Sequence, residues 1–312
     1  MPHPETLGLV ITRKLNIAIL TADPANYSNR RMMEAGRELG HHVYPLPSIE
    51  QCLDVDAQAY VSELTPRPDA VIPRIGVGLS GFGQCLIIAF EDAGVLSMTS
   101  SCGLLHSRDK FLAGQILSAG GIRVPKTRTF ASRGHIDGAI KAVGGYPFIL
   151  KKLKGTQGSA VYLINDVDLA HKKIGKYIRK RTPFLIQEFI KESKGSDLRC
   201  FVVGGRVVAA MRRTAASGDF RANIHAGGMG ENIELSNAEI DMAVKAAEIL
   251  KLNIAGVDIL QSDQGPLLLE VNSSPGLQGI EAATQIDVAA HIIRFIETQT
   301  LQAENTPQQI HG

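Results

Sequence analysis

Apolar residues in the first third of this chain show two spacings, which alternate along it. Short apolar runs predict strands at 15–20, 43–46, 70–73 and 95–98. Apolar residues at helical spacing predict helices between them, at about 28–39 with Ser28 as the cap, and at about 82–93. This alternation is typical of a small, mainly parallel sheet with helices on its faces.

This pattern of apolar residues changes after about residue 106, where neighbouring strands are expected to pair with each other. A helix is expected at 108–119 and a basic helix at about 166–181; further strands are expected at 148–153, 160–164 and 184–190. Two hairpins follow, 198–203 with 206–211 around Gly204–Gly205, and 254–260 with 266–271. Core positions on the last two helices are predicted at Ile240, Ala243, Val244, Ala247, Leu250, Val288, Ile292, Phe295 and Ile296. The pattern therefore predicts an α/β first half and an α+β second half.

Composition narrows the class of protein. Hydrophobic residues make up 44% of the 312 positions, and 33 Lys and Arg against 31 Asp and Glu leave a net charge of +2. That balance is globular and gives no support for a nucleic-acid coat. No apolar run approaches the ~20 residues of a membrane span, and the four cysteines have no zinc-site spacing. We expect no membrane partner, no secretion signal and a cytoplasmic location.

A glycine pattern at Gly76–Gly81 matches G-x-G-x-x-G between a strand and a helix. The acidic residue that a dinucleotide site needs ~20 residues later is absent, so we interpret the run as a tight turn. Arg74, just before this turn, is placed to hold a substrate carboxylate at a strand end.

A second glycine-containing loop, 151–159, begins with Lys151 and Lys152. Small residues let backbone N–H groups approach an anion, and lysines supply charge. The loop lacks a Walker spacing, and a solvated hairpin turn remains an alternative.

Two carboxylates and an amide form the strongest candidate site. Asp258 lies on one predicted strand, while Glu270 and Asn272, two apart and therefore on one face, lie on its hairpin partner. Buried carboxylates need a cation, and an all-oxygen set suits Mg²⁺ bound with phosphates. The alternative is a set of ion pairs with arginines; Asn272 favours the metal.

A fourth group consists of weak fragments in the run 187–199 and at Arg221 and Asn223. A strand edge at 187–190 offers backbone groups to an adenine ring, and Asp197 offers a carboxylate to ribose hydroxyls. Arg221 and Asn223 suit phosphate oxygens. The alternative is an acidic loop end with a surface arginine.

Taken in order, these motifs resemble those of an ATP-grasp ligase, and the match is nearest to the RimK-like branch. Supporting runs are 73–76, 107–110, 218–221, 255–260 and 275–281. The resemblance covers about 15–297. It implies a Rossmann-like pre-ATP-grasp domain followed by a two-lobed ATP-grasp module. The corresponding boundaries are 1–14 (extension), 15–105 (N-terminal domain), 106–185 (central lobe), 186–300 (C-terminal lobe) and 301–312 (polar tail).

The resemblance also implies roles for individual residues. Lys110 and Lys151 reach phosphates, and the loop Gly155, Thr156, Gln157 and Gly158 closes over them. Glu188 and Phe189 line the adenine, Asp197 takes the ribose, and Arg221 and Asn223 meet phosphates. Asp258, Glu270 and Asn272 hold two Mg²⁺ or Mn²⁺ ions. Lys151, Arg74 and Arg221 are the expected catalytic residues.

The implied reaction activates a carboxylate with ATP and joins it to an amine. In this branch L-glutamate is added to the C-terminus of a ribosomal protein, the sixth of the small subunit. Alternatives are a ligase that joins glutamate to a small molecule, cofactor or carrier protein, a nucleotide-binding protein without turnover, and an oxidoreductase built on Gly76–Gly81. We also expect a homo-oligomer.

Three departures from the branch bear on these alternatives. Ala226 stands where Arg usually follows the run 223–225, Ser273 replaces a commoner Ala or Pro, and the amino end is longer. The first departure touches the acceptor more than the ATP chemistry.

Overall fold

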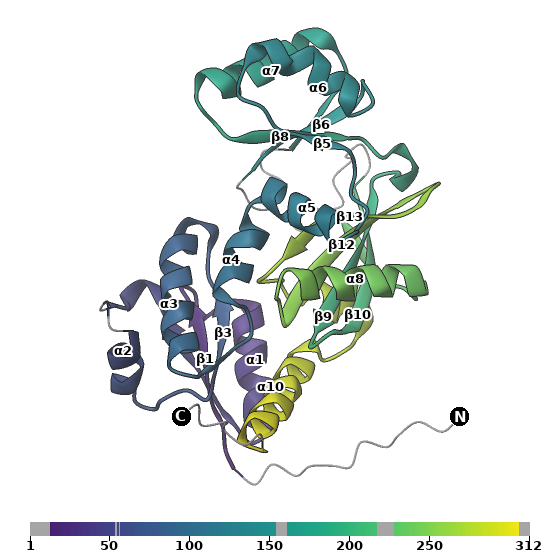
Figure 1. The fold of residues 1–312 in the computed structure, drawn as a ribbon. Coiled ribbons are helices and arrows are strands. Elements are labelled where there is room, and N and C mark those ends of the chain that lie inside the picture. Colours follow the sequence, from purple (N-terminus) through teal and green to yellow (C-terminus); the bar gives the residue numbers. More distant parts are fainter. Residues whose placement is uncertain (1–12, 54, 56, 154–160, 217–227, 306–312) are drawn as a thin grey trace.

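The computed structural model describes residues 13–53, 55, 57–153, 161–216 and 228–305. Within these residues the strands form three sheets, one in each of the N-terminal domain, the central lobe and the C-terminal lobe (Figure 1). The N-terminal domain and the C-terminal lobe lie side by side, and the central lobe stands beyond them. This mixed architecture confirms the predicted fold class.

The N-terminal domain has a parallel sheet in the order β2-β1-β3-β4. Its strands are β1 (Asn16–Thr21), β2 (His42–Pro47), β3 (Ala70–Arg74) and β4 (Leu96–Ser97). Its helices are α1 (Tyr27–Glu38), α2 (Ala57–Glu63), α3 (Ser80–Asp92) and α4 (Ser101–Arg108). Five of six β1 residues are buried, as expected for a central strand covered on both faces.

The central lobe follows α5 (Lys110–Ala119) and has an antiparallel sheet in the order β5-β8-β6-β7. Its strands are β5 (Thr127–Arg128), β6 (Phe148–Lys152), β7 (Val161–Ile164) and β8 (Phe184–Glu188). Helices α6 (Ile136–Ala142) and α7 (Val167–Arg179) pack on one face of it through an apolar cluster.

The C-terminal lobe has an antiparallel sheet in the order β11-β10-β9-β12-β13. Its strands are β9 (Ser196–Val203), β10 (Arg206–Thr214), β11 (Met229–Asn232), β12 (Ile254–Ser262) and β13 (Gly265–Asn272). Its helices are α8 (Asn237–Ile249), α9 (Gln278–Thr284) and α10 (Val288–Asn305). Apolar residues of α5 and α8 cover one face of the sheet. The opposite face carries the charged residues described below.

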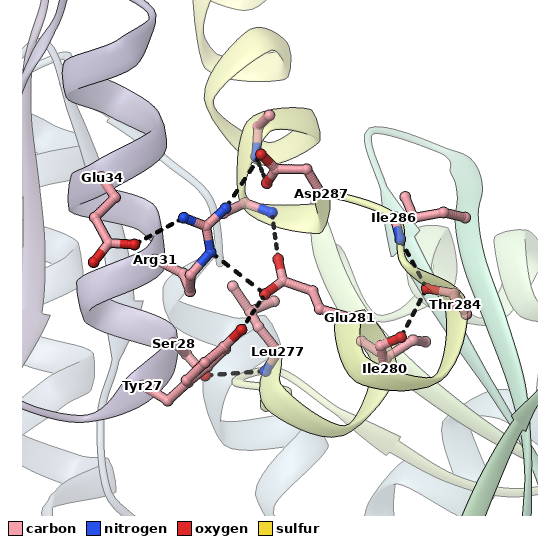
Figure 2. Close-up of polar contacts among 12 residues, drawn as sticks. Tyr27, Ser28, Arg31, Glu34, Leu277, Ile280, Glu281, Thr284, Ile286 and Asp287 are labelled. Carbon is pink, nitrogen blue, oxygen red and sulfur yellow. Dashed lines mark hydrogen bonds and ion pairs between the residues drawn. The ribbon is translucent and has the colours of Figure 1, made fainter.

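The N-terminal domain is joined to the C-terminal lobe by apolar packing and by polar contacts of α1. Arg31 is 3.7 Å from a carboxylate oxygen of Glu281 and 3.2 Å from one of Asp287, while Tyr27 donates a hydrogen bond to Glu281 (Figure 2). Ser28 accepts a hydrogen bond from the backbone N–H of Leu277. These contacts tie α1 to the chain that follows β13.

Several sequence predictions need correction. Asn26, not Ser28, caps α1, and Ser28 is instead used for the contact with Leu277. The predicted helix 108–119 begins at Lys110, because Asp109 caps it after the separate helix α4. Ile240 is 36% exposed and is not a core residue, because the buried side of α8 is formed by its alanines. The sequence reasoning missed α2, α4, α6, α9, β5 and β11, most of which are short.

None of the helices in the described part of the chain is long and apolar enough to cross a membrane.

The turn between β9 and β10 generates a prediction about stability. Gly204 and Gly205 both have positive φ, but a Cβ on Gly204 would lie 2.2 Å from the Phe295 ring, whereas one on Gly205 has nothing within 4 Å. Gly204→Ala adds a clash, typically about 1–3 kcal/mol, to the backbone strain that both substitutions share. We expect a clearly lower denaturation midpoint for Gly204→Ala than for Gly205→Ala. Equal midpoints would contradict this packing of α10.

Candidate active site

Five neighbouring charged residues lie on the face of the C-terminal sheet opposite α8. The strand register places Asp258 of β12 directly opposite both Arg199 of β9 and Glu270 of β13. Two residues along β9, Asp197 lies opposite Arg213 of β10. Because alternate residues of a strand share a face, the register alone gathers these side chains.

The central members of this group form a buried ion network. Arg199 binds Asp258 through two nitrogens, one of them 2.8 Å from Oδ2. Arg213 binds Asp197 through Nε at 2.6 Å and Nη2 at 2.8 Å, and its Nη2 is also 2.9 Å from Asp258 Oδ2. Arg213 thereby connects the two aspartates across β9.

The two aspartates have different pKa values because their surroundings differ. Burial opposes the ionisation of Asp258, but Arg199 and Arg213 together hold its pKa below the usual value. Burial raises the pKa of Asp197 to about 6, and Arg213 offsets only part of that effect. Asp258 therefore stays ionised in the neutral range, whereas Asp197 titrates closer to it.

Two lysines from outside this sheet approach the same face. Lys110, at the start of α5, is 2.8 Å from Glu270 Oε2. Lys151 of β6 donates to Gln187 Oε1 at 2.8 Å, and its charge interacts with Glu270, Asp197 and Asp258. Burial lowers the pKa of Lys151 to about 8, and the nearby charge of Lys110 acts in the same direction.

The alternation along β6 separates Lys151 from its neighbour. Phe148 and Leu150 are fully buried among the helices of the central lobe. Lys151 points to the other face, toward the charged sheet, while Lys152 is exposed. The structure therefore places one of the two adjacent lysines at the site.

The predicted metal ligands Asp258, Glu270 and Asn272 come together on the paired strands β12 and β13. One carboxylate offers about four lone-pair sites, and Asp258 uses three of them for Arg199 and Arg213. Glu270 has only Lys110 as an ion-pair partner among the described residues, and it remains partly exposed. Oxygen donors with spare lone pairs fit a hard divalent cation.

The metal assignment nevertheless stays a prediction. The described residues contain no group of three or more His, Cys, Asp and Glu side chains that could hold a metal ion, and Asn272 is an amide and so belongs to none of these types. The ion pairs of Asp258 with arginines are the alternative that the sequence left open.

Glu188 and Phe189 lie where β8 leaves the central lobe. Both line a cleft of about 640 Å³, together with Lys126 and residues of the β12–β13 turn. Glu188 accepts a hydrogen bond from the backbone N–H of Lys126 at 3.2 Å. The volume is in the range of small-molecule sites. Gln187, the residue before Glu188 on β8, accepts the hydrogen bond from Lys151.

Arg74 ends β3 and donates to the carbonyl oxygen of Pro275 at 2.6 Å. It thereby places the N-terminal domain against the chain that follows the metal-ligand candidates. The glycine run after Arg74 forms a turn into α3, in agreement with our interpretation of Gly76–Gly81.

Several predicted site residues lie outside the described part of the chain: Gly155, Thr156, Gln157, Gly158, Arg221 and Asn223. Conversely, sequence reasoning gave no individual role to the side chains of Arg199, Arg213, Gln187 or Arg108. The signal for Arg199 was its place two residues after Asp197, which puts both on one face of a strand.

Comparisons with known proteins identify the family of this chain. A model of the RimK PreATP-grasp domain matches residues 15–104, and a model of the RimK-like ATP-grasp domain matches residues 107–296. A protein of Marinomonas sp. (strain MWYL1), named probable alpha-L-glutamate ligase, is 44% identical over 287 residues, which cover 91% of this chain and 95% of that protein. One of the same name from Aeromonas salmonicida (strain A449) is 43% identical over 299 residues, 95% of this chain and 100% of its own.

Solved structures show the same fold. The ATP-grasp ligase PsnB, complexed with a phosphomimetic variant of a minimal precursor, Mg and ADP, superposes with a TM-score of 0.72. It is 20% identical, and the match covers 92% of this chain and 99% of PsnB. The family models and the relatives lead to the same result: this chain is a ligase that forms C–N bonds, and it belongs to the RimK-like ATP-grasp family.

Proposed function

We propose that this ligase adds L-glutamate to the C-terminus of a small-subunit ribosomal protein, the sixth, with ATP as the energy source. The observation that carries the proposal is the meeting of Lys110 and Lys151 with Asp258 and Glu270 on one sheet face. Cations for phosphates and oxygen ligands for a metal are what an ATP-dependent ligase needs. The names of the relatives support glutamate as a substrate. The proposed location is the cytoplasm, and a homo-oligomer stays a prediction.

The proposed reaction has two steps. A carboxylate oxygen of the acceptor attacks the γ-phosphorus of ATP. This step forms an acylphosphate and releases ADP. The amine of glutamate then attacks the acyl carbon, loses a proton and expels phosphate, which leaves an amide. Neither step needs a protein nucleophile, so the protein acts by positioning groups and stabilising charge.

The lysines serve the phosphates in this mechanism. Lys151 has a lowered pKa because burial disfavours its charge, and a phosphate beside it would restore the balance. Lys110 is held by Glu270 at the start of α5 and faces the same space. Asp258, Glu270 and Asn272 would hold Mg²⁺ or Mn²⁺, as two ions, whose chemistry is to neutralise charge on the phosphate oxygens.

The nucleoside end is assigned to the side of β8. We place the adenine against Glu188 and Phe189, which line the cleft, and the ribose near Asp197. The loop Gly155, Thr156, Gln157 and Gly158, with Arg221 and Asn223, completes the phosphate site in this proposal.

The acceptor is assigned to the side of the N-terminal domain. Arg74 projects there beside the chain that follows Asn272, and Arg suits bidentate carboxylate binding. Arg221 is proposed as its catalytic partner. PsnB, of the same fold, has been solved with a precursor peptide, which supports a peptide as the acceptor.

The two lysines of β6 test the phosphate assignment. Lys151→Ala removes a charged donor, typically worth about 1.5–3 kcal/mol, so we expect ATP affinity to fall about 10- to 100-fold. Lys152→Ala, the matched control on the opposite face, should leave affinity and rate unchanged. Calorimetric ATP titration and ADP release measure both. Equal losses, or a larger loss for Lys152→Ala, would contradict the strand orientation.

Glu270→Gln tests the metal assignment. The amide removes a charge that would bind metal, and loss of such a contact typically lowers the rate about 10²- to 10³-fold. Circular dichroism should show an intact fold, because Glu270 is partly exposed and pairs only with Lys110 among the described residues. Glu231→Gln, at an exposed ion pair with Arg212, is the control. Wild-type ADP release by folded Glu270→Gln would refute the assignment.

The acceptor can be identified by trapping the acylphosphate. We expect glutamate to drive ADP formation only when a C-terminal peptide of the ribosomal protein is present. Hydroxylamine in place of glutamate should give a hydroxamate on that peptide, detected by mass spectrometry. If a small carboxylate replaces the peptide with equal efficiency, the proposed protein acceptor is wrong while the ATP chemistry stands.

A further inference from the structure

Two arginines of the N-terminal domain lie together at the junction with the C-terminal lobe. Arg74 ends β3 and donates to the carbonyl of Pro275 at 2.6 Å. Arg108 ends α4, donates to the carbonyl of Ile75 and is 3.4 Å from Ser274 Oγ. Arg74 therefore contacts an oxygen of the C-terminal lobe, and Arg108 contacts oxygens on both sides of the interface.

These contacts are made with neutral oxygens and do not neutralise the two positive charges. Neither arginine forms an ion pair with a carboxylate in the described part of the chain, and Arg108 Nε is buried without a hydrogen-bond partner. Burial lowers the pKa of both groups, that of Arg74 to about 10, and the charge of Arg108 contributes to this. A guanidinium has five N–H donors, so carbonyl oxygens satisfy only part of each group.

Such an arrangement is costly for a protein that binds nothing there. Neutral oxygens accept hydrogen bonds but do not cancel charge, and two adjacent half-buried cations repel each other. An anion between the arginines would relieve both effects. The pair therefore indicates a site for an anion.

The position of the arginine pair indicates which anion binds there. Glu270 is near enough to favour the charge of Arg108. Lys110, two residues beyond Arg108, pairs with that same glutamate. The arginine pair thus lies next to the lysines assigned to phosphates but on the side of the N-terminal domain. An anion held there lies beside the phosphoryl group that is transferred.

We propose that Arg74 and Arg108 together form the binding site for the acceptor's C-terminal carboxylate. This inference rests on the proposed function and adds Arg108, which no motif assigned. Planar guanidinium groups bind a planar carboxylate through paired hydrogen bonds, whereas the compact charges of lysines serve phosphates. Two arginines give the carboxylate a fixed orientation beside Lys110.

A purely structural role for Arg108 predicts a different effect of its loss on ligand binding. If Arg108 only holds the carbonyl of Ile75, its loss weakens the binding of every acceptor ligand equally. If it binds the carboxylate, its loss weakens only ligands that carry one. The comparison of a peptide acid with its C-terminal amide separates these roles.

The experiment titrates the peptide acid and the peptide amide into protein saturated with Mg²⁺ and a non-hydrolysable ATP analogue. The peptide is the C-terminus of the ribosomal protein. For the wild type we expect the acid to bind about 10- to 100-fold more tightly, the usual effect of charged hydrogen bonds. Arg108→Gln should reduce this ratio to about 1–2, and Arg108→Lys should give an intermediate ratio, with affinity for the ATP analogue unchanged.

Arg67→Gln is the matched control, because Arg67 donates to the carbonyl of Ala93 on an exposed part of the same domain. It should keep the wild-type ratio. An unchanged ratio in Arg108→Gln overturns the proposal, as does an equal loss of acid and amide binding. A rise in the KM for glutamate alone also overturns it, since the site would then hold the amine substrate.

A second experiment tests the arginine site if the ribosomal peptide binds neither as the acid nor as the amide. That result refutes the proposed acceptor, and the probes become N-acetylglycine and N-acetylglycinamide in thermal unfolding of the same nucleotide complex. We expect the acid alone to raise the Tm of the wild type and to leave that of Arg108→Gln unchanged. Equal shifts in both proteins, or none in the wild type, overturn the arginine site itself.

Discussion

Charge pairing among Asp197, Arg199, Arg213 and Asp258 constrains the whole C-terminal lobe. Asp197, Arg213 and Asp258 are buried and Arg199 is nearly so, and removal of one partner from such a network typically costs about 3–5 kcal/mol. A slip of β9 by one residue would turn Asp197 and Arg199 toward the apolar face under α8. The network therefore fixes the register of β9, β10 and β12. With that register set, Asp258 faces Glu270.

The same constraint explains which parts of the site were accessible from the sequence. Strand alternation predicted that Glu270 and Asn272 share a face and that Lys151 and Lys152 do not, because both are local properties. The partners of Asp258 were not predictable. Arg199 and Arg213 lie 59 and 45 positions before it along the chain, and only the sheet order brings them together. Pairing of distant charges requires the register, which a single sequence does not contain.

The limits of the fold prediction have similar causes. The parallel N-terminal sheet and both hairpins were predicted because apolar runs and turn glycines mark them. Short elements such as β5, β11 and α9 lack enough residues to show a period. Ile240 misled the assignment of the α8 core because spacing alone cannot tell which side of a helix meets the sheet. There, small alanines bring the helix close.

The central lobe has a core of its own, and this has a consequence for how the molecule opens. All the buried residues of that core lie between positions 136 and 186, on β6–β8, α6 and α7, with none from the other two sheets. The N-terminal domain and the C-terminal lobe, in contrast, share one apolar cluster that includes β1, β10 and α10. The lobe is thus built as a separate cooperative unit. In hydrogen exchange, its amide protons would exchange together through openings that leave β1 and β9 protected.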